Sequence, residues 1–276
     1  MNIKQIYFLI LFFSAWSLYA GEIKFAGEAK QGGLIIAFGK NISSATLNNA
    51  KLQVDKSGYF IFGFDRDAKG VFKLKVRFKN KKTETFEYNI EPQIYEEQRL
   101  TLAKKYVVPP KKQSKRIQKE NKLMKAARAS VGKMKNALFI SGFSYPVDTV
   151  NIHSVFGSQR ILNGRKANVH NGLDFAGSEG DTIRAVSDGV VRIAGKDFFY
   201  NGNFILLDHG QGLTSVYLHM SSLIARTNQK VKKGEAIGLM GATGRATGPH
   251  LHLGVQWFKK RIDPMILFNT SLPSQE

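Results

Sequence analysis

Apolar and polar residues alternate in short runs along the first third of the chain. One apolar run spans 59–64 and follows the turn signal Lys56-Ser57-Gly58, and a second, alternating run spans 71–78. Period-two patterning places successive side chains on opposite faces of a strand. Short strands separated by turn residues are typical of a β-sandwich or meander. We therefore predict a small β-sandwich domain at residues 21–108.

A second series of short strands occupies the C-terminal half of the chain. Residues 180–186 lead through the turn signal Ser187-Asp188-Gly189 into 190–194, and further strand patterns follow as far as residue 219. Such patterning predicts predominantly antiparallel β structure. The expected fold class is therefore mainly β, with an antiparallel β barrel-sandwich at residues 138–276.

A strongly basic segment separates the two β regions. Pro109-Pro110 interrupts the strand pattern, and Ile117, Met124 and Ala127 then recur at helical spacing. Around them lie eight cations with Glu120 as the only acidic residue among them: Lys111, Lys112, Lys115, Arg116, Lys119, Lys122, Lys125 and Arg128. We predict a basic amphipathic helix within a linker at residues 109–137. Contact with an anionic membrane or wall surface and a merely solvated helix face are both consistent with this pattern.

The first residues have the features of a secretion signal. A short basic opening, Met1-Asn2-Ile3-Lys4, precedes an apolar run from about Ile6 to Ala20, which ends in a small residue. This order is typical of a cleaved signal peptide, and the run is shorter than the roughly 20 residues of a spanning helix. We therefore expect residues 1–20 to be a signal peptide and the mature protein to be exported to the periplasm or cell envelope.

Composition narrows the class of partner. The chain has 41 Lys and Arg against 21 Asp and Glu, a formal net charge of +20, and its 43% hydrophobic residues are sufficient for folded cores. A basic surface favours an anionic partner. Because we expect export, we exclude nucleic acid and expect a cell-wall polymer or an acidic lipid surface.

The candidate chemistry lies in histidine motifs. All six histidines fall between His153 and His252, and two motifs stand out: His170-Asn171-Gly172-Leu173-Asp174 and His250-Leu251-His252. Two imidazoles and a carboxylate are a common ligand set for catalytic zinc, which keeps a further position open for water. The chain has no cysteine, which excludes a thiolate site.

A third motif, Tyr217-Leu218-His219, adds another imidazole. If these segments are strands, Tyr217 and His219 point to one side, as do His250 and His252. Four imidazoles and one carboxylate then exceed what a three-ligand site requires, and the extra imidazoles are candidates for acid–base catalysis. His153 and His209 have no paired spacing, and we interpret both as structural.

These motifs together resemble the lysostaphin-type, or LytM-domain, zinc endopeptidases that cut peptidoglycan peptides. The resemblance extends to Phe156-Gly157-Ser158-Gln159-Arg160, to residues 180–189 and to the segment 243–249 before the last motif. It implies one zinc ion per chain, bound by His170, Asp174 and His252. It also implies that His219 and His250 are catalytic histidines outside the ligand set. Which of the two acts as the base stays open.

The function that this resemblance implies is hydrolysis of peptide bonds in peptidoglycan stem peptides or cross-links by a zinc-activated water. The alternative is a non-catalytic LytM-type protein that regulates or activates cell wall amidases. Arg160 and Tyr217 are candidate substrate-binding residues. A structural ion pair for Arg160 and packing for Tyr217 are the competing interpretations.

Overall fold

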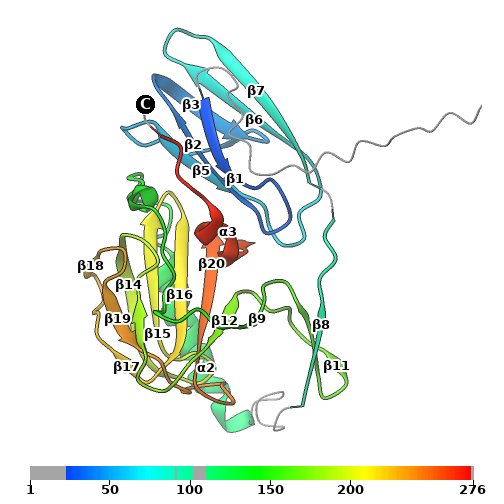
Figure 1. Cartoon of the computed structure of the whole chain (residues 1–276), viewed down its shortest axis with the longest axis vertical. Helices are drawn as coiled ribbons and strands as arrows, with labels where there is room; N and C mark the ends of the chain where they lie inside the picture. The colour runs from blue at the N-terminus through cyan, green and yellow to red at the C-terminus, as the bar shows by residue number, and fades with distance from the viewer. Residues whose placement is uncertain (1–22, 91, 102–109, 275–276) are drawn as a thin grey trace, which may run out of the picture.

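The computed structural model describes residues 23–90, 92–101 and 110–274 (Figure 1). The chain is mainly β, which confirms the predicted fold class. The predicted signal peptide at residues 1–20 lies outside the described residues. Among the described helices, none combines the length and apolar character that crossing a membrane requires.

Two small sheets form the N-terminal unit. The first has the strand order β1-β2-β5, and the second has the order β4-β3-β6-β7. In β6 the alternate residues Leu74, Val76 and Phe78 are buried, as period-two patterning predicts. The strands are β1 (Ile23–Gly27), β2 (Leu34–Gly39), β3 (Ile42–Leu47), β4 (Ala50–Lys51), β5 (Tyr59–Gly63), β6 (Gly70–Phe78) and β7 (Thr83–Ile90).

An eight-stranded sheet dominates the C-terminal unit. Its order is β18-β14-β15-β16-β20-β12-β9, with β21 paired to β20, and a second sheet has the order β13-β19-β17. Both sheets are open, so no barrel closes among the described residues. The strands are β9 (Ile152–Ser154), β12 (Leu173–Ala176), β13 (Thr182–Arg184), β14 (Gly189–Phe198), β15 (Gly202–Gly210), β16 (Leu213–Met220), β17 (Ser222–Leu223), β18 (Lys230–Val231), β19 (Ala236–Leu239), β20 (His250–Trp257) and β21 (Lys260–Ile262).

The basic segment forms the helix α2 (Ser114–Arg128), preceded by the short helix η1 (Lys111–Gln113). Arg116 pairs with Glu120 at 2.8 Å, and Glu120 also accepts a hydrogen bond from the Phe199 amide at 2.9 Å. Arg128 donates to the side chain of Gln256. These contacts attach the helix to the C-terminal unit, while its lysines stay exposed. Two further helices are η2 (Leu138–Ser141) and α3 (Pro264–Asn269).

Three strands outside the large sheets connect the two units. Strand β8 (Glu97–Leu100) leaves the N-terminal unit and pairs in parallel with β10 (Gln159–Leu162), which also pairs with β11 (Arg165–Lys166). The order in this sheet is β11-β10-β8, and Figure 1 shows β8 running down from the N-terminal unit. The units also touch directly, because the Asp263 amide donates to the Gly32 carbonyl at 2.8 Å.

Candidate metal centre and active site

The three residues expected to bind metal meet in space. Asp174 of β12 and His252 of β20 are direct partners across the antiparallel ladder, and His170 precedes β12 by three residues. The Nε2 atom of His170 lies 3.0 Å from Oδ1 of Asp174 and 3.1 Å from Nδ1 of His252. The Nδ1 atom of His252 lies 2.7 Å from the same Asp174 oxygen. Three ligand atoms therefore converge on one point.

The donor set fits a zinc ion. Nδ1 of His170 lies 2.8 Å from the Val155 carbonyl oxygen, which can only accept, so Nδ1 carries the proton and Nε2 presents its lone pair to the cluster. Tetrahedral ligands bound at about 2.0–2.2 Å lie roughly 3.3 Å from one another. The observed separations of 2.7–3.1 Å are close to that value.

The pKa shifts of Asp174 and His252 both favour the deprotonated form. Burial alone would raise the pKa of Asp174, but its close contacts with the imidazoles of His170 and His252 outweigh burial and hold that pKa well below its usual range. Burial lowers the pKa of His252, although Asp174 opposes this shift. A carboxylate and two neutral imidazoles are the protonation states that bind metal.

Gly172, between His170 and Asp174 in the chain, leaves room for the ring of His252. A Cβ atom at position 172 would stand 2.9 Å from Nε2 of His252 and 2.3 Å from the Leu253 carbonyl oxygen. Both contacts are too close for real side chains. The absence of a side chain at Gly172 is therefore a packing requirement of the ligand cluster.

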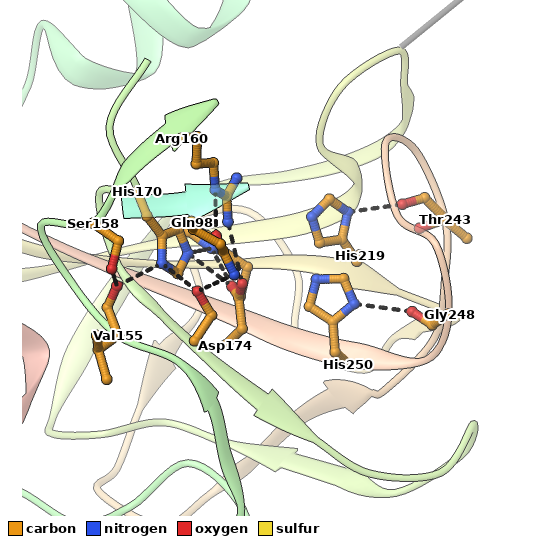
Figure 2. Close-up of polar contacts among 12 residues, drawn as sticks. Gln98, Val155, Ser158, Arg160, His170, Asp174, His219, Thr243, Gly248 and His250 are labelled. Atoms are coloured by element: carbon orange, nitrogen blue, oxygen red, sulfur yellow. Dashed lines mark hydrogen bonds and ion pairs between the residues drawn. The ribbon is translucent and has the colours of Figure 1, made fainter. Parts of the chain in front are cut away.

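The other two histidines, His219 and His250, lie side by side next to this cluster, with ring centroids 4.8 Å apart (Figure 2). The ring centroids of His219 and His252 are 6.4 Å apart. Nδ1 of His219 is 2.8 Å from the Thr243 carbonyl oxygen, and Nδ1 of His250 is 2.9 Å from that of Gly248. Both rings therefore carry the proton on Nδ1, and Figure 2 shows their other nitrogens on the side of the ligand cluster.

His219 has an unusual backbone. Its φ is +68°, which non-glycine residues rarely adopt, and the β15–β16 ladder shifts register nearby. Its amide donates to the Asn201 carbonyl at 3.0 Å. Such strain is often found at functional sites. Burial lowers the pKa of His219 to about 3, and repulsion from His250 and His252 adds to this shift. The ring is therefore neutral at pH 7.

A known peptidase family matches the part of the chain that contains the ligand cluster. Residues 168–264 match the model of peptidase family M23. This stretch contains the three residues of the ligand cluster and also His219 and His250. Residues 168–264 therefore resemble an M23 peptidase domain.

Relatives and solved structures extend this finding. Peptidoglycan DD-endopeptidase ShyA of Vibrio cholerae is 41% identical over 110 residues, which is 39% of this chain and 25% of ShyA. DD-carboxypeptidase/endopeptidase Mpg of Neisseria meningitidis is 33% identical over 131 residues, 48% of this chain and 29% of Mpg. The match thus spans less than a third of either relative. A crystal structure from Pseudomonas aeruginosa, assigned to peptidase M23, has a TM-score of 0.62 and 28% identity, covering 87% of this chain and 95% of its own.

The side chains of the two candidate substrate-binding residues, Arg160 and Tyr217, both contact other groups of the protein. Tyr217 is fully buried, and its hydroxyl accepts hydrogen bonds from the Val186 amide at 2.9 Å and from Ser215 at 3.0 Å. It belongs to the core, which favours packing over the predicted substrate contact. Arg160 donates to Oδ2 of Asp174 at 3.3 Å, the ion pair that was the competing interpretation.

The two histidines interpreted as structural lie outside the ligand cluster. His153 is exposed. His209, near the end of β15, is fully buried, and its two ring nitrogens lie 2.7 Å from the Asp188 carbonyl oxygen and 2.7 Å from the Ser215 hydroxyl.

Two residues near the ligands had no signal in the sequence. The Ser154 hydroxyl lies 3.0 Å from Nδ1 of His170. Gln98 contacts Ser154 and Arg160 from strand β8. Neither stands in a motif, and Gln98 reaches the site only through the parallel pairing of β8 with β10.

Proposed function

We propose that this chain is an exported zinc metalloendopeptidase that hydrolyses peptide bonds in peptidoglycan stem peptides or cross-links. The observation that carries the proposal is the convergence of His170, Asp174 and His252 beside two histidines with free Nε2 atoms. The M23 domain supports a peptidase. The relatives named as peptidoglycan DD-endopeptidases support the substrate class.

His170, Asp174 and His252 would hold one zinc ion. When bound, zinc supplies Lewis-acid chemistry: it polarises a carbonyl group and lowers the pKa of a coordinated water to about 7. The Val155 carbonyl fixes the tautomer of His170, and Arg160 neutralises the Asp174 oxygen that faces away from the imidazoles. The protein thus orients each ligand before substrate arrives.

His219 and His250 would transfer protons and stabilise charge during hydrolysis. Their Nδ1 protons are committed to backbone carbonyls, so any proton exchanged with the substrate or the attacking water passes through Nε2. One Nε2 takes the proton of the attacking water and afterwards delivers it to the leaving amine nitrogen. The other ring, with a proton on Nε2 as well as on Nδ1, donates a hydrogen bond to the developing oxyanion and so stabilises the transition state.

A regulator of wall amidases remains the alternative, and one digestion distinguishes the two functions. Purified peptidoglycan is incubated with the protein, with its zinc-free form and with the Asp174→Ala variant, and the products are identified by mass spectrometry. The proposal expects new amino and carboxyl termini within stem peptides or cross-links from the parent alone. If the parent releases none, yet stimulates an added amidase, the chain is a regulator.

The cellular site and the contact of helix α2 are also proposals. The signal-peptide features of residues 1–20 support export to the periplasm or envelope, which N-terminal sequencing of the mature protein tests. The exposed lysines Lys115, Lys119 and Lys122 of α2 support contact with an anionic wall polymer. Because Arg116 and Arg128 are engaged with the protein itself, only part of the basic run is available.

A further inference from the structure

Strand β8 brings a residue to the active site from outside the segment that matches the M23 family. Gln98 lies 70 positions before residue 168, where that match begins. In the parallel pairing of β8 with β10, Gln98 is the register partner of Arg160. Figure 2 shows the Gln98 side chain among the ligands, next to Arg160 and Asp174.

The Gln98 amide links the supports of two metal ligands. Its Nε2 donates to the Ser154 hydroxyl at 3.2 Å, and that hydroxyl lies 3.0 Å from Nδ1 of His170. Its Oε1 accepts from Nε of Arg160 at 3.2 Å, and Arg160 in turn donates to Asp174 at 3.3 Å. A guanidinium can only donate, so the oxygen of the amide must face Arg160 and its NH2 group must face Ser154.

We infer that Gln98 is a positioning residue of the metal centre, which holds Ser154 and Arg160 in place and through them orients His170 and Asp174. The inference rests on the proposed zinc site. An amide suits this place because it supplies one acceptor and one donor on the same rigid plane. Groups that orient metal ligands in this way typically contribute about 10- to 100-fold to metal affinity.

The position of β8 outside the C-terminal β region allows two opposite roles for this strand, a support of the site or a cover over it. The metal centre is completed by a strand that follows the N-terminal unit, so the C-terminal β region at residues 138–276 lacks one of these supports when it stands alone. The opposite role for β8 is a cover that obstructs the site. The two roles differ in sign: loss of a support weakens metal binding and catalysis, whereas loss of a cover raises catalysis and leaves metal affinity unchanged.

The test uses the full mature chain with Gln98→Ala and Gln98→Met. Methionine keeps the length of the side chain but removes both hydrogen bonds, so at least one variant preserves the packing of β8. Arg99→Ala is the matched control, because Arg99 lies in the same strand, is exposed, and directs its guanidinium to the exposed Glu97 at 2.7 Å. Zinc affinity is measured by competition with a chelator, and thermal unfolding of the metal-free proteins reports the fold.

We expect both Gln98 variants to bind zinc about 10- to 100-fold more weakly than the parent, while Arg99→Ala matches it. The visible spectrum of the cobalt(II)-loaded protein should also shift in the Gln98 variants, because the ligand geometry changes. Unfolding temperatures of the metal-free proteins should agree. Zinc affinity within twofold of the parent in both variants overturns the inference, and a raised cleavage rate with unchanged affinity identifies β8 as a cover. A parent that binds no zinc refutes the proposed function instead.

Discussion

The Nδ1 atom of His219 lies 2.8 Å from the carbonyl oxygen of Thr243. A carbonyl oxygen can only accept, so this contact determines the tautomer of the ring and leaves Nε2 without a proton. The same relationship holds between His250 and Gly248. The loop between β19 and β20 therefore presents oxygen atoms to the two histidines, whereas a phosphate-binding loop presents N–H groups. This loop orients the two imidazoles, with Nδ1 of each turned to a carbonyl oxygen.

Replacing either of these histidines separates catalysis from metal binding. We expect His219→Ala and His250→Ala to retain zinc, because neither ring belongs to the ligand cluster. Turnover should fall by roughly 100- to 10,000-fold, the usual contribution of general acid–base catalysis. Metal analysis and hydrolysis of a soluble peptidoglycan fragment are measured on the same samples. A metal-free variant, or one that cuts at the parental rate, would show that its role is assigned incorrectly.

Replacing Asp174 removes a ligand. Asp174→Ala should lose bound zinc and all measurable cleavage, since two neutral imidazoles are too few for tight binding. Asp148→Ala is the control, because Asp148 is an exposed carboxylate paired with Arg184 at 2.9 Å on the surface. Zinc at full stoichiometry in Asp174→Ala, measured after dialysis, would contradict the ligand assignment.

A methyl group at position 172 tests the packing of His252. Gly172→Ala places Cβ 2.9 Å from Nε2 of His252, whereas Gly254→Ala places it 3.8 Å from the same atom. We therefore expect zinc affinity to fall by at least about tenfold in Gly172→Ala, comparable to loss of a ligand-orienting group. Gly254→Ala should lose less. Equal affinities in chelator competition would show that the ring can move aside at no cost.

The buried His219 makes the stability of the metal-free protein depend on pH. Its pKa is lowered to about 3 in the folded state, while that of an unfolded histidine is about 6.5. The unfolded chain therefore binds more protons between these values, and stability should fall as pH drops from about 6.5 toward 3. One such proton contributes at most about 1.4 kcal/mol per pH unit.

Denaturant unfolding of chelator-treated protein between pH 4.5 and 7.5 measures this effect. His219→Gln keeps an N–H donor for Thr243 but cannot titrate, so its stability should vary less steeply with pH. The burial-lowered pKa of His252 acts in the same direction and remains in the variant. Identical slopes in parent and variant would mean that His219 is protonated alike in both states.

The lysines of α2 provide a test of wall contact. Lys115, Lys119 and Lys122 are exposed, so replacing all three with Gln should leave cleavage of a small soluble peptide unchanged. Co-sedimentation with peptidoglycan sacculi should weaken in the variant, and the parent should lose retention as salt rises, because exposed charges are screened within about 8 Å at physiological ionic strength. Retention that is indifferent to both changes would indicate a solvated helix face.

Short-range patterning in the sequence predicts much of this molecule. Alternation predicts the β class, and the helical spacing of Ile117, Met124 and Ala127 predicts a helix where α2 (Ser114–Arg128) is found. The paired motifs indicate which histidines and which aspartate come together, because residues two apart in a strand share a face. These features depend on neighbours in the chain, so the sequence contains their signal.

The same reasoning failed where tertiary contacts override the local pattern. Two-residue spacing predicted that Tyr217 and His219 point to one side. His219 instead adopts a φ of +68° beside a register shift, while the Tyr217 hydroxyl bonds to the Val186 amide in the core. A bulge in one strand depends on its partner strand, so nothing local to β16 predicts it.

The sequence by itself determined the β class, the basic helix and the ligand types of the candidate site. Only the tertiary structure decided how those ligands are supported. Arg160 donates to Asp174. Gln98, which lies 62 positions before Arg160 in the chain, accepts a hydrogen bond from Arg160. Parallel pairing of β8 with β10 produces that contact. Such pairing follows from packing between distant parts of the chain rather than from the periodicity of the sequence. No motif therefore predicts that Gln98 lies at the site.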